Sequence, residues 1–191
     1  MTKIYDSFLS QIIEKIIDEK NIDQFVETGT YTGKSLSWIS QRFQKVYTIE
    51  INEHYHTQTK ENFKNTNINF LLGDSRDCLR VINLNNPSVF WLDAHSGGGV
   101  FSNDEDCPLV DELKIIIESK RDHFILIDDA YAFMFPLAHP YNYKKWPTLN
   151  DIFDIIGSNY TIFIKNDVII AIPKIDQNTF QEMFSKNDFS K

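Results

Sequence analysis

The chain has 191 residues, of which 27 are acidic and 19 are basic, giving a formal net charge of -8. This balance opposes the electrostatic attraction on which nucleic-acid binding depends, so DNA and RNA are excluded from the expected partners. The chain has no apolar run near the ~18 residues that span a bilayer and begins without a signal-peptide pattern, so we expect a cytoplasmic protein with no membrane partner. Its two cysteines, Cys78 and Cys107, form no C-x-x-C pattern, which argues against a disulfide framework or a zinc site.

One α/β domain is expected to span residues 1–191, because a chain of this length can bury its apolar side chains around a single core. Residues 1–21 are predicted to form an amphipathic N-terminal helix, since Ile4, Phe8 and Ile12 recur at four-residue spacing. Residues 24–174 would form the core. The sequence leaves the oligomeric state open, with a homodimer among the alternatives.

Residues 24–35 combine a short apolar run with two glycines and indicate a strand, a tight turn and the start of a helix. Gly29 and Gly33 can adopt positive φ and carry no Cβ, so a ligand can approach the backbone closely there. The N–H groups that open the next helix would point outward. The segment therefore predicts a cradle for a nucleotide or a cofactor.

The spacing of the glycines distinguishes three kinds of ligand site that this turn could form. A phosphate-binding P-loop needs four residues between its first glycine and its Gly-Lys-Ser, but only three residues separate Gly29 from Gly33. The dinucleotide fingerprint needs a second glycine where this chain has Tyr31, whose side chain would obstruct a pyrophosphate. The pattern that fits is acidic-x-Gly-x-x-x-Gly, with Glu27 as the acid at the strand end.

A strand–helix–strand unit is completed after the turn. Residues 34–43 have helical periodicity, and residues 45–51 form a β-branched strand that contains Glu50 near its end. Glu50 comes 21 residues after Gly29, about the distance at which such folds place a carboxylate on ribose hydroxyls. Glu50 is therefore a candidate ribose ligand, with a solvated charge at a strand end as the alternative.

The rest of the chain alternates predicted helices and strands. These are a helix at 53–64, a strand at 68–74, a strand at 88–93, a helix from 108, a strand at 124–129, a helix at 148–156, strands at 160–165 and 168–173, and a helix at 176–186. The last two strands form a hairpin around the short Asn166-Asp167 turn. Residues 130–147 hold aromatic side chains among prolines and would form part of a substrate wall or pack as a loop.

Acidic side chains end the third, fourth and fifth predicted strands, at Asp74, Asp93 and the pair Asp128-Asp129. Asp93 begins the phrase Asp-Ala-His-Ser-Gly-Gly-Gly, which contains His95 and three glycines suited to a substrate loop or a flexible turn. Open α/β sheets bind ligands at the carboxyl ends of their strands, so Asp93 and His95 are the candidate catalytic residues.

With its glycine turn, Glu50 and the acids on successive strand ends, the chain resembles class I S-adenosylmethionine (SAM) methyltransferases over residues 24–174. Residues 90–99, followed by Asp106-Cys107-Pro108-Leu109, are similar to a group of small bacterial members. The resemblance implies an α/β fold with a single Rossmann-like domain, a mostly parallel seven-stranded sheet, helices on both faces and a C-terminal antiparallel hairpin. The residues that would bind SAM are Glu27, Gly29, Thr30, Tyr31, Gly33, Ser35, Glu50, Asp74, Ser75 and Asp93.

The carboxylates are also similar to those of metal-dependent catechol-type and macrolide-sugar O-methyltransferases. By that resemblance Asp93, Asp128 and Asp129 would bind a metal, and oxygen ligands suit Mg²⁺, Mn²⁺ or Ca²⁺ rather than zinc. Without a metal, mutual repulsion would leave some of these acids protonated. The lysine base of the catechol type would fall on Ser96, so chemistry alone makes His95 the expected proton acceptor.

The sequence thus predicts a SAM-dependent O-methyltransferase acting on a hydroxyl of a small molecule, with a sugar or nucleotide-sugar of surface-polysaccharide biosynthesis as a candidate acceptor. The alternative is a nucleotide-dependent binding or regulatory module, because residues 29–35 are one residue short of a P-loop. Glu27 and Glu50 are expected at exposed strand ends, where they would contribute more to cofactor affinity than to folding.

Overall fold

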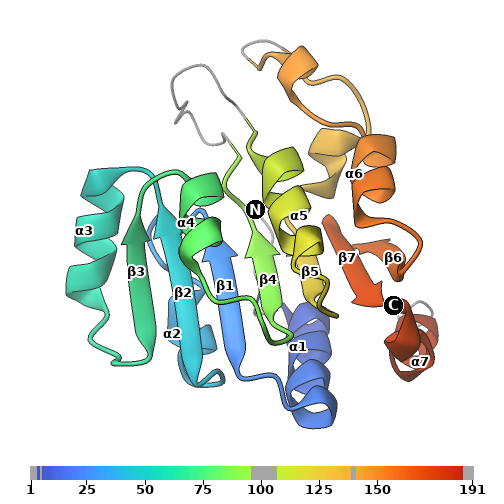
Figure 1. Cartoon of the computed structure of the whole chain (residues 1–191), viewed down its shortest axis with the longest axis horizontal. Coiled ribbons are helices and arrows are strands. Elements are labelled where there is room, and N and C mark those ends of the chain that lie inside the picture. The colour runs from blue at the N-terminus through green and yellow to red at the C-terminus, as the bar shows by residue number, and fades with distance from the viewer. Residues whose placement is uncertain (1–3, 5, 96–106, 139–140, 187–191) are drawn as a thin grey trace.

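The computed structural model describes residues 4, 6–95, 107–138 and 141–186 (Figure 1). Its strands are β1 Gln24–Thr28, β2 Lys45–Glu50, β3 Ile68–Leu72, β4 Val89–Leu92, β5 Phe124–Ile127, β6 Tyr160–Lys165 and β7 Val168–Pro173. Its α-helices are α1 Ser7–Lys20, α2 Leu36–Ile39, α3 Glu53–Asn62, α4 Ser75–Val81, α5 Leu109–Glu118, α6 Leu149–Ile156 and α7 Gln177–Lys186. Short 3₁₀ helices are η1 Ala130–Phe133, η2 Tyr143–Lys145 and η3 Lys174–Asp176.

The seven strands form one sheet in the order β3-β2-β1-β4-β5-β7-β6. The first five strands pair in parallel, whereas β7 is antiparallel to both β5 and β6. Thr28 pairs with Leu92, and Leu92 pairs with Ile127. The residues that follow β1, β4 and β5 therefore emerge side by side at one edge of the sheet, as predicted for an open α/β sheet.

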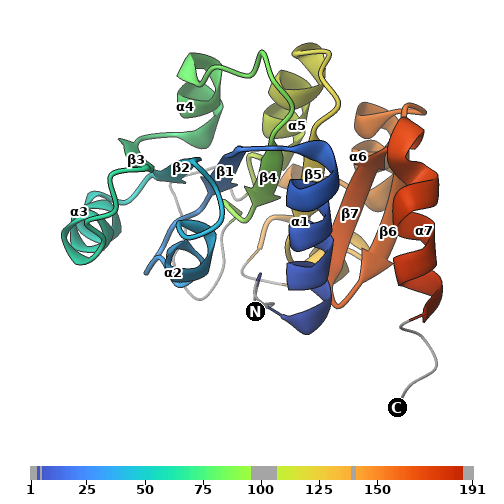
Figure 2. The same cartoon turned by 90° about the horizontal axis from the view of Figure 1, so that it is seen from below.

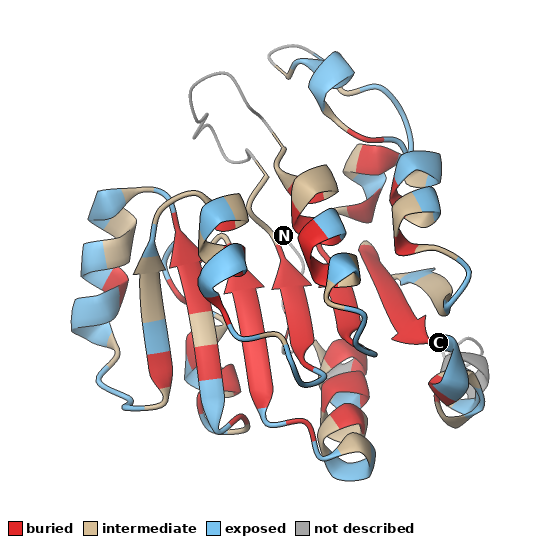
Figure 3. Ribbon diagram, viewed as in Figure 1, coloured by how far each residue is buried: buried red, intermediate tan, exposed pale blue. Residues whose placement is uncertain are grey.

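Helices cover both faces of the sheet and bury two apolar clusters. Figure 2 shows α1, α2 and α7 on one face and α4, α5 and α6 on the other. Successive side chains of a strand point to opposite faces. Phe25 therefore belongs to the cluster under α1, α2 and α7, and Val26 belongs to the cluster under α4, α5 and α6. The central strands β1, β4, β5 and β7 are buried along their whole length (Figure 3). These features confirm the predicted fold class.

The C-terminal hairpin has the tight turn that its sequence predicts. Asn166 and Asp167 both have positive φ, 51° and 62°, as a two-residue hairpin loop requires. Asp167 also anchors the segment after β5, because its carbonyl accepts a hydrogen bond from Ala130 N at 2.8 Å and its carboxylate accepts one from Tyr131 N at 2.8 Å. The hairpin therefore holds the beginning of the segment 130–138 in place.

The predicted helix at residues 34–43 is shorter in the structure. Only Leu36–Ile39 is α-helical, although Leu36, Ile39 and Phe43 are all buried as their spacing indicated. Ser35 precedes the helix but makes no side-chain cap, because its hydroxyl donates to Glu27 instead. Within the described part of the chain, no helix has the length and apolar character needed to cross a membrane.

Candidate functional site

The glycine turn packs directly against the end of β4. Gly29 N and Thr30 N both donate to the carbonyl of Ile49, at 3.0 and 3.1 Å, which holds the turn over the end of β2. Gly29 has φ of 81°, and a Cβ at this position would lie 2.1 Å from the carbonyl oxygen of Asp93. Only glycine fits here, so the turn brings the ends of β1, β2 and β4 together.

Glu27 is buried beneath this turn, with 2% of its surface exposed. Thr48 Oγ1 donates to its Oε2 at 2.8 Å, and the Ser35 hydroxyl donates to its Oε1. Burial raises the pKa of Glu27 to about 7, against the lowering effect of these two donors. The expectation of an exposed strand-end acid was wrong for Glu27, because the chain after the turn folds back over the end of β1.

Glu50 is also buried, with 7% of its surface exposed, so the expectation of exposure was wrong here too. Its Oε2 accepts a hydrogen bond from Tyr31 N at 2.7 Å, and its Oε1 accepts one from Asn52 N at 2.8 Å. The ring of Tyr31 packs edge-on against Tyr55, with centroids 4.5 Å apart. Glu50 therefore orders the loops after β1 and β2, and its contact with a ribose stays a prediction.

Asp74 caps the helix that follows β3. Its Oδ1 accepts hydrogen bonds from Arg76 N and Nε, both at 2.9 Å, and its Oδ2 accepts one from Arg76 Nη2 at 2.6 Å. The Arg76 guanidinium lowers the pKa of Asp74. The neighbouring Ser75 is buried. Contact of Asp74 and Ser75 with SAM stays a prediction.

Glu112 on α5, which no sequence motif indicated, lies near Ser75 and Thr28. Glu112 is 1% exposed, and burial raises its pKa to about 7, although the nearby Ser75 and Thr28 hydroxyls act in the opposite direction. Glu112 lies among the apolar residues of an amphipathic helix, and this pattern does not indicate that its carboxyl group is buried. A second buried carboxyl therefore lies near Ser75, one of the residues predicted to bind SAM.

Asp93, His95 and Asp129 come together at the ends of β4 and β5. His95 Nδ1 lies 3.5 Å from Asp93 Oδ1, and His95 Nε2 lies 3.5 Å from Asp129 Oδ2. The His95 side chain is 7% exposed, and neither ring nitrogen has a hydrogen-bond partner among the described residues. Burial lowers the pKa of His95, whereas the Asp129 charge acts to raise it. The imidazole is thus held neutral between two carboxyl groups.

The charges around Asp93 oppose its ionisation. Burial raises the pKa of Asp93 well above its usual range, and the nearby carboxylates of Asp128, Asp129 and Glu27 raise it further. A cation bound at this edge of the sheet would relieve that repulsion.

Three side chains at this edge of the sheet could hold a metal ion. Asp93, His95 and Asp129 each offer a ligand atom, and these atoms all lie within 4.8 Å of one another. Asp128 is 1% exposed, and its Oδ1 accepts a hydrogen bond from Asp129 N at 2.9 Å, so a metal-binding role for Asp128 stays a prediction. Asp129 has φ of 54°, in the left-handed region. Ser96 and the glycines at 97–99 lie outside the described residues.

Two solved structures with bound cofactor share this architecture. An O-methyltransferase from Bacillus cereus in complex with SAH, the demethylated product of SAM, is 13% identical over 88% of this chain and 82% of its own, with a TM-score of 0.63. TomG from Streptomyces achromogenes, an O-methyltransferase of tomaymycin synthesis in complex with SAM, is 12% identical over 87% of this chain and 78% of its own, with a TM-score of 0.62.

The chain has the class I methyltransferase fold. No family model and no curated protein matches the sequence. The same fold also occurs in a precorrin 8W decarboxylase from Methanobacterium thermoautotrophicum, which is 15% identical over 85% of this chain and 89% of its own, with a TM-score of 0.53. The methyltransferase fold thus accommodates more than one reaction, and the function must be argued from the site.

Proposed function

We propose that the chain transfers the methyl group of SAM to a hydroxyl of a small molecule. The observation that supports this most is the gathering of Glu27, Glu50, Asp93 and Asp129 around the glycine turn, at the ends of β1, β2, β4 and β5. SAM carries a sulfonium and an ammonium group against one carboxylate, so it is a net cation. Its binding would offset the repulsion that raises the pKa of Asp93.

The cofactor would lie across these strand ends. We assign the methionine end to residues 29–33 with Glu27 and Asp93, the ribose to Glu50, and the adenine to Asp74 and Ser75. The likeness to SAM and SAH complexes of the same fold supports this placement. Thr30, Tyr31 and Ser35 act chiefly through the turn, because their hydrogen bonds to Thr48, Glu50 and Glu27 hold it in shape.

His95 is the proposed general base. The acceptor hydroxyl gives its proton to a ring nitrogen of His95 while its oxygen forms a bond to the methyl carbon, the carbon–sulfur bond breaks, and SAH leaves. Burial lowers the pKa of His95 and keeps the ring neutral, as a proton acceptor must be. Asp93 and Asp129, each 3.5 Å from a ring nitrogen, orient the imidazole and stabilise its protonated form.

Metal binding is a second candidate use of the same cluster. Two carboxylates and an imidazole whose two nitrogens lack hydrogen-bond partners among the described residues fit a divalent cation. We assign the ligands to Asp93, His95 and Asp129. Such an ion would act as a Lewis acid toward the acceptor oxygen. The imidazole moves the expected preference from Mg²⁺ toward Mn²⁺ or a later transition metal.

We expect His95→Ala to weaken Mn²⁺ binding more than the ~10–100-fold that loss of an outer-shell partner costs. The measurement is the electron paramagnetic resonance signal of free Mn²⁺ during titration with protein. His54→Ala is the matched control, since His54 is exposed on α3. Equal Mn²⁺ affinity of the parent and the His95 variant would remove the metal assignment, while the base role of His95 would stand.

Ligand-induced stabilisation separates the methyltransferase from the nucleotide-binding alternative. At a hundred times its dissociation constant, SAH should raise the free energy of unfolding by about 2.7 kcal/mol, whereas ATP should have no effect. The measurement is the melting temperature with each ligand. Stabilisation by ATP but not by SAH would contradict the proposed function.

A further inference from the structure

An apolar cavity lies next to the Asp93–His95–Asp129 cluster, within the segment that follows β5. Its volume is about 370 Å³, and its walls are formed mainly by aromatic and aliphatic side chains. The lining residues that matter here are Phe133, Phe135, Leu137, Tyr143, Trp146 and Leu149. Pockets of about 300–1,000 Å³ are usual for small ligands, and this volume is near the lower limit. It suits one or two rings rather than a polymer.

Two side chains are shared between the cavity and the active site. Phe133 stacks on the His95 ring, with centroids 6.0 Å apart and planes 17° apart, and Trp146 lies 5.3 Å from the same ring. Both also line the cavity. A ligand in the cavity would therefore lie one aromatic side chain away from the proposed base.

The lining residues favour an apolar ring over a sugar. No charged side chain is among the described residues that line the cavity. A sugar ring carries several hydroxyls, and each one buried without a partner would cost about 1–3 kcal/mol. Trp146 Nε1 is buried and has no hydrogen-bond partner among the described residues.

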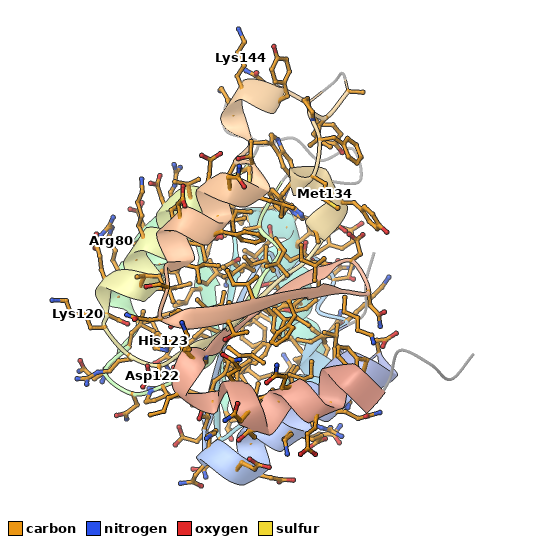
Figure 4. All side chains as sticks on the ribbon, turned by 90° about the vertical axis from the view of Figure 1, so that its right-hand side faces the viewer. Arg80, Lys120, Asp122, His123, Met134 and Lys144 are labelled. Carbon is orange, nitrogen blue, oxygen red and sulfur yellow. The ribbon has the colours of Figure 1, made fainter. Side chains whose placement is uncertain are left out.

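The charge of the segment also restricts the ligand. Residues 130–150 contain no acidic residue, although the chain has 27. Its lysines, Lys144 and Lys145, are exposed on η2, and Figure 4 shows Lys144 pointing away from the body of the molecule. A cationic acceptor would find no carboxylate in this segment. A neutral acceptor fits.

We propose that this cavity holds a planar apolar ring of the methyl acceptor, so that the acceptor is an aryl or fused-ring alcohol and not a sugar. This inference rests on the proposed function. It differs from the sugar or nucleotide-sugar predicted from the sequence, because four of the described lining side chains are aromatic and offer stacking surfaces.

The test measures by ligand-observed NMR how two probes bind to the full chain, with and without saturating SAH. The probes are 2-naphthol and methyl α-D-glucopyranoside. We expect 2-naphthol to bind and the glucoside not to bind. Leu137→Trp, which fills the cavity, should weaken 2-naphthol binding by about tenfold or more. Ile164→Trp is the matched control, because Ile164 is an exposed aliphatic residue of β6.

Phe135→Ala is a second variant that removes one wall at an exposed position and should also weaken 2-naphthol binding. Binding of 2-naphthol that is unchanged in both cavity variants, or binding of the glucoside in its place, would overturn the inference. Binding of 2-naphthol to a protein that does not bind SAH would contradict the proposed function and leave the ring cavity in place. The two failures are therefore distinguishable.

Discussion

Gly29→Ala is expected to abolish SAH binding and to lower the free energy of unfolding by more than the ~1–3 kcal/mol that backbone strain alone costs. The added Cβ would lie 2.1 Å from the carbonyl oxygen of Asp93 and 2.6 Å from its carbonyl carbon. These are backbone atoms of a buried strand end and cannot rotate away. The ends of β1 and β4 would have to separate, and the cofactor is proposed to lie across them.

Gly157→Ala is the matched control for this change. Gly157 also has positive φ, 76°, but a Cβ there would meet no atom within 4 Å. The control variant should therefore show the strain cost alone and bind SAH as the parent does. Urea unfolding and SAH calorimetry of both variants give the comparison. Equal destabilisation, or normal SAH binding by Gly29→Ala, would contradict the direct packing of the turn on β4.

Glu27→Gln is expected to remove a large part of the pH dependence of stability. The pKa of Glu27 is 4.5 without perturbation and about 7 in the fold, so the folded state binds an extra proton between these values. The free energy of unfolding therefore falls as the pH rises from about 4.5 to about 7, by about 3 kcal/mol from this group. Glutamine has no proton to lose, so the variant should lack this fall.

Urea unfolding of the parent and the variant at about pH 5 and about pH 8 measures this difference. The pKa of Glu112 is also raised to about 7, so the single variant Glu27→Gln should keep the part of the fall in unfolding free energy that Glu112 causes. The double variant Glu27→Gln, Glu112→Gln should lose the contributions of both groups. Glu61→Gln, at an exposed position of α3, is the control and should behave as the parent. An unchanged pH dependence in Glu27→Gln would show that Glu27 is not held protonated.

Much of the fold could be read from the sequence because local patterns decide it. The parallel strands are continuous apolar runs between helical segments, and the short Asn166-Asp167 loop closes the hairpin with both residues at positive φ. The order of acids along the chain placed Glu27, Asp93 and Asp129 at one edge correctly, because parallel strands end on the same side.

The burial and orientation of those acids could not be read from the sequence. Glu27 is covered by residues that follow it in the chain, and its partner Thr48 comes from the neighbouring strand. Asp128 and Asp129 are adjacent in sequence, yet Asp128 is 1% exposed, whereas Asp129 Oδ2 lies 3.5 Å from His95 Nε2. Such contacts depend on side-chain direction at a turn, which neither composition nor periodicity records.

A crystal structure of the chain with SAH tests the central claim most directly. We predict SAH across residues 29–33, with the ribose hydroxyls in hydrogen-bond reach of the Glu50 carboxylate and the sulfur facing Asp93 and His95. SAH bound elsewhere, or with its ribose away from Glu50 and its sulfur away from His95, would contradict the account.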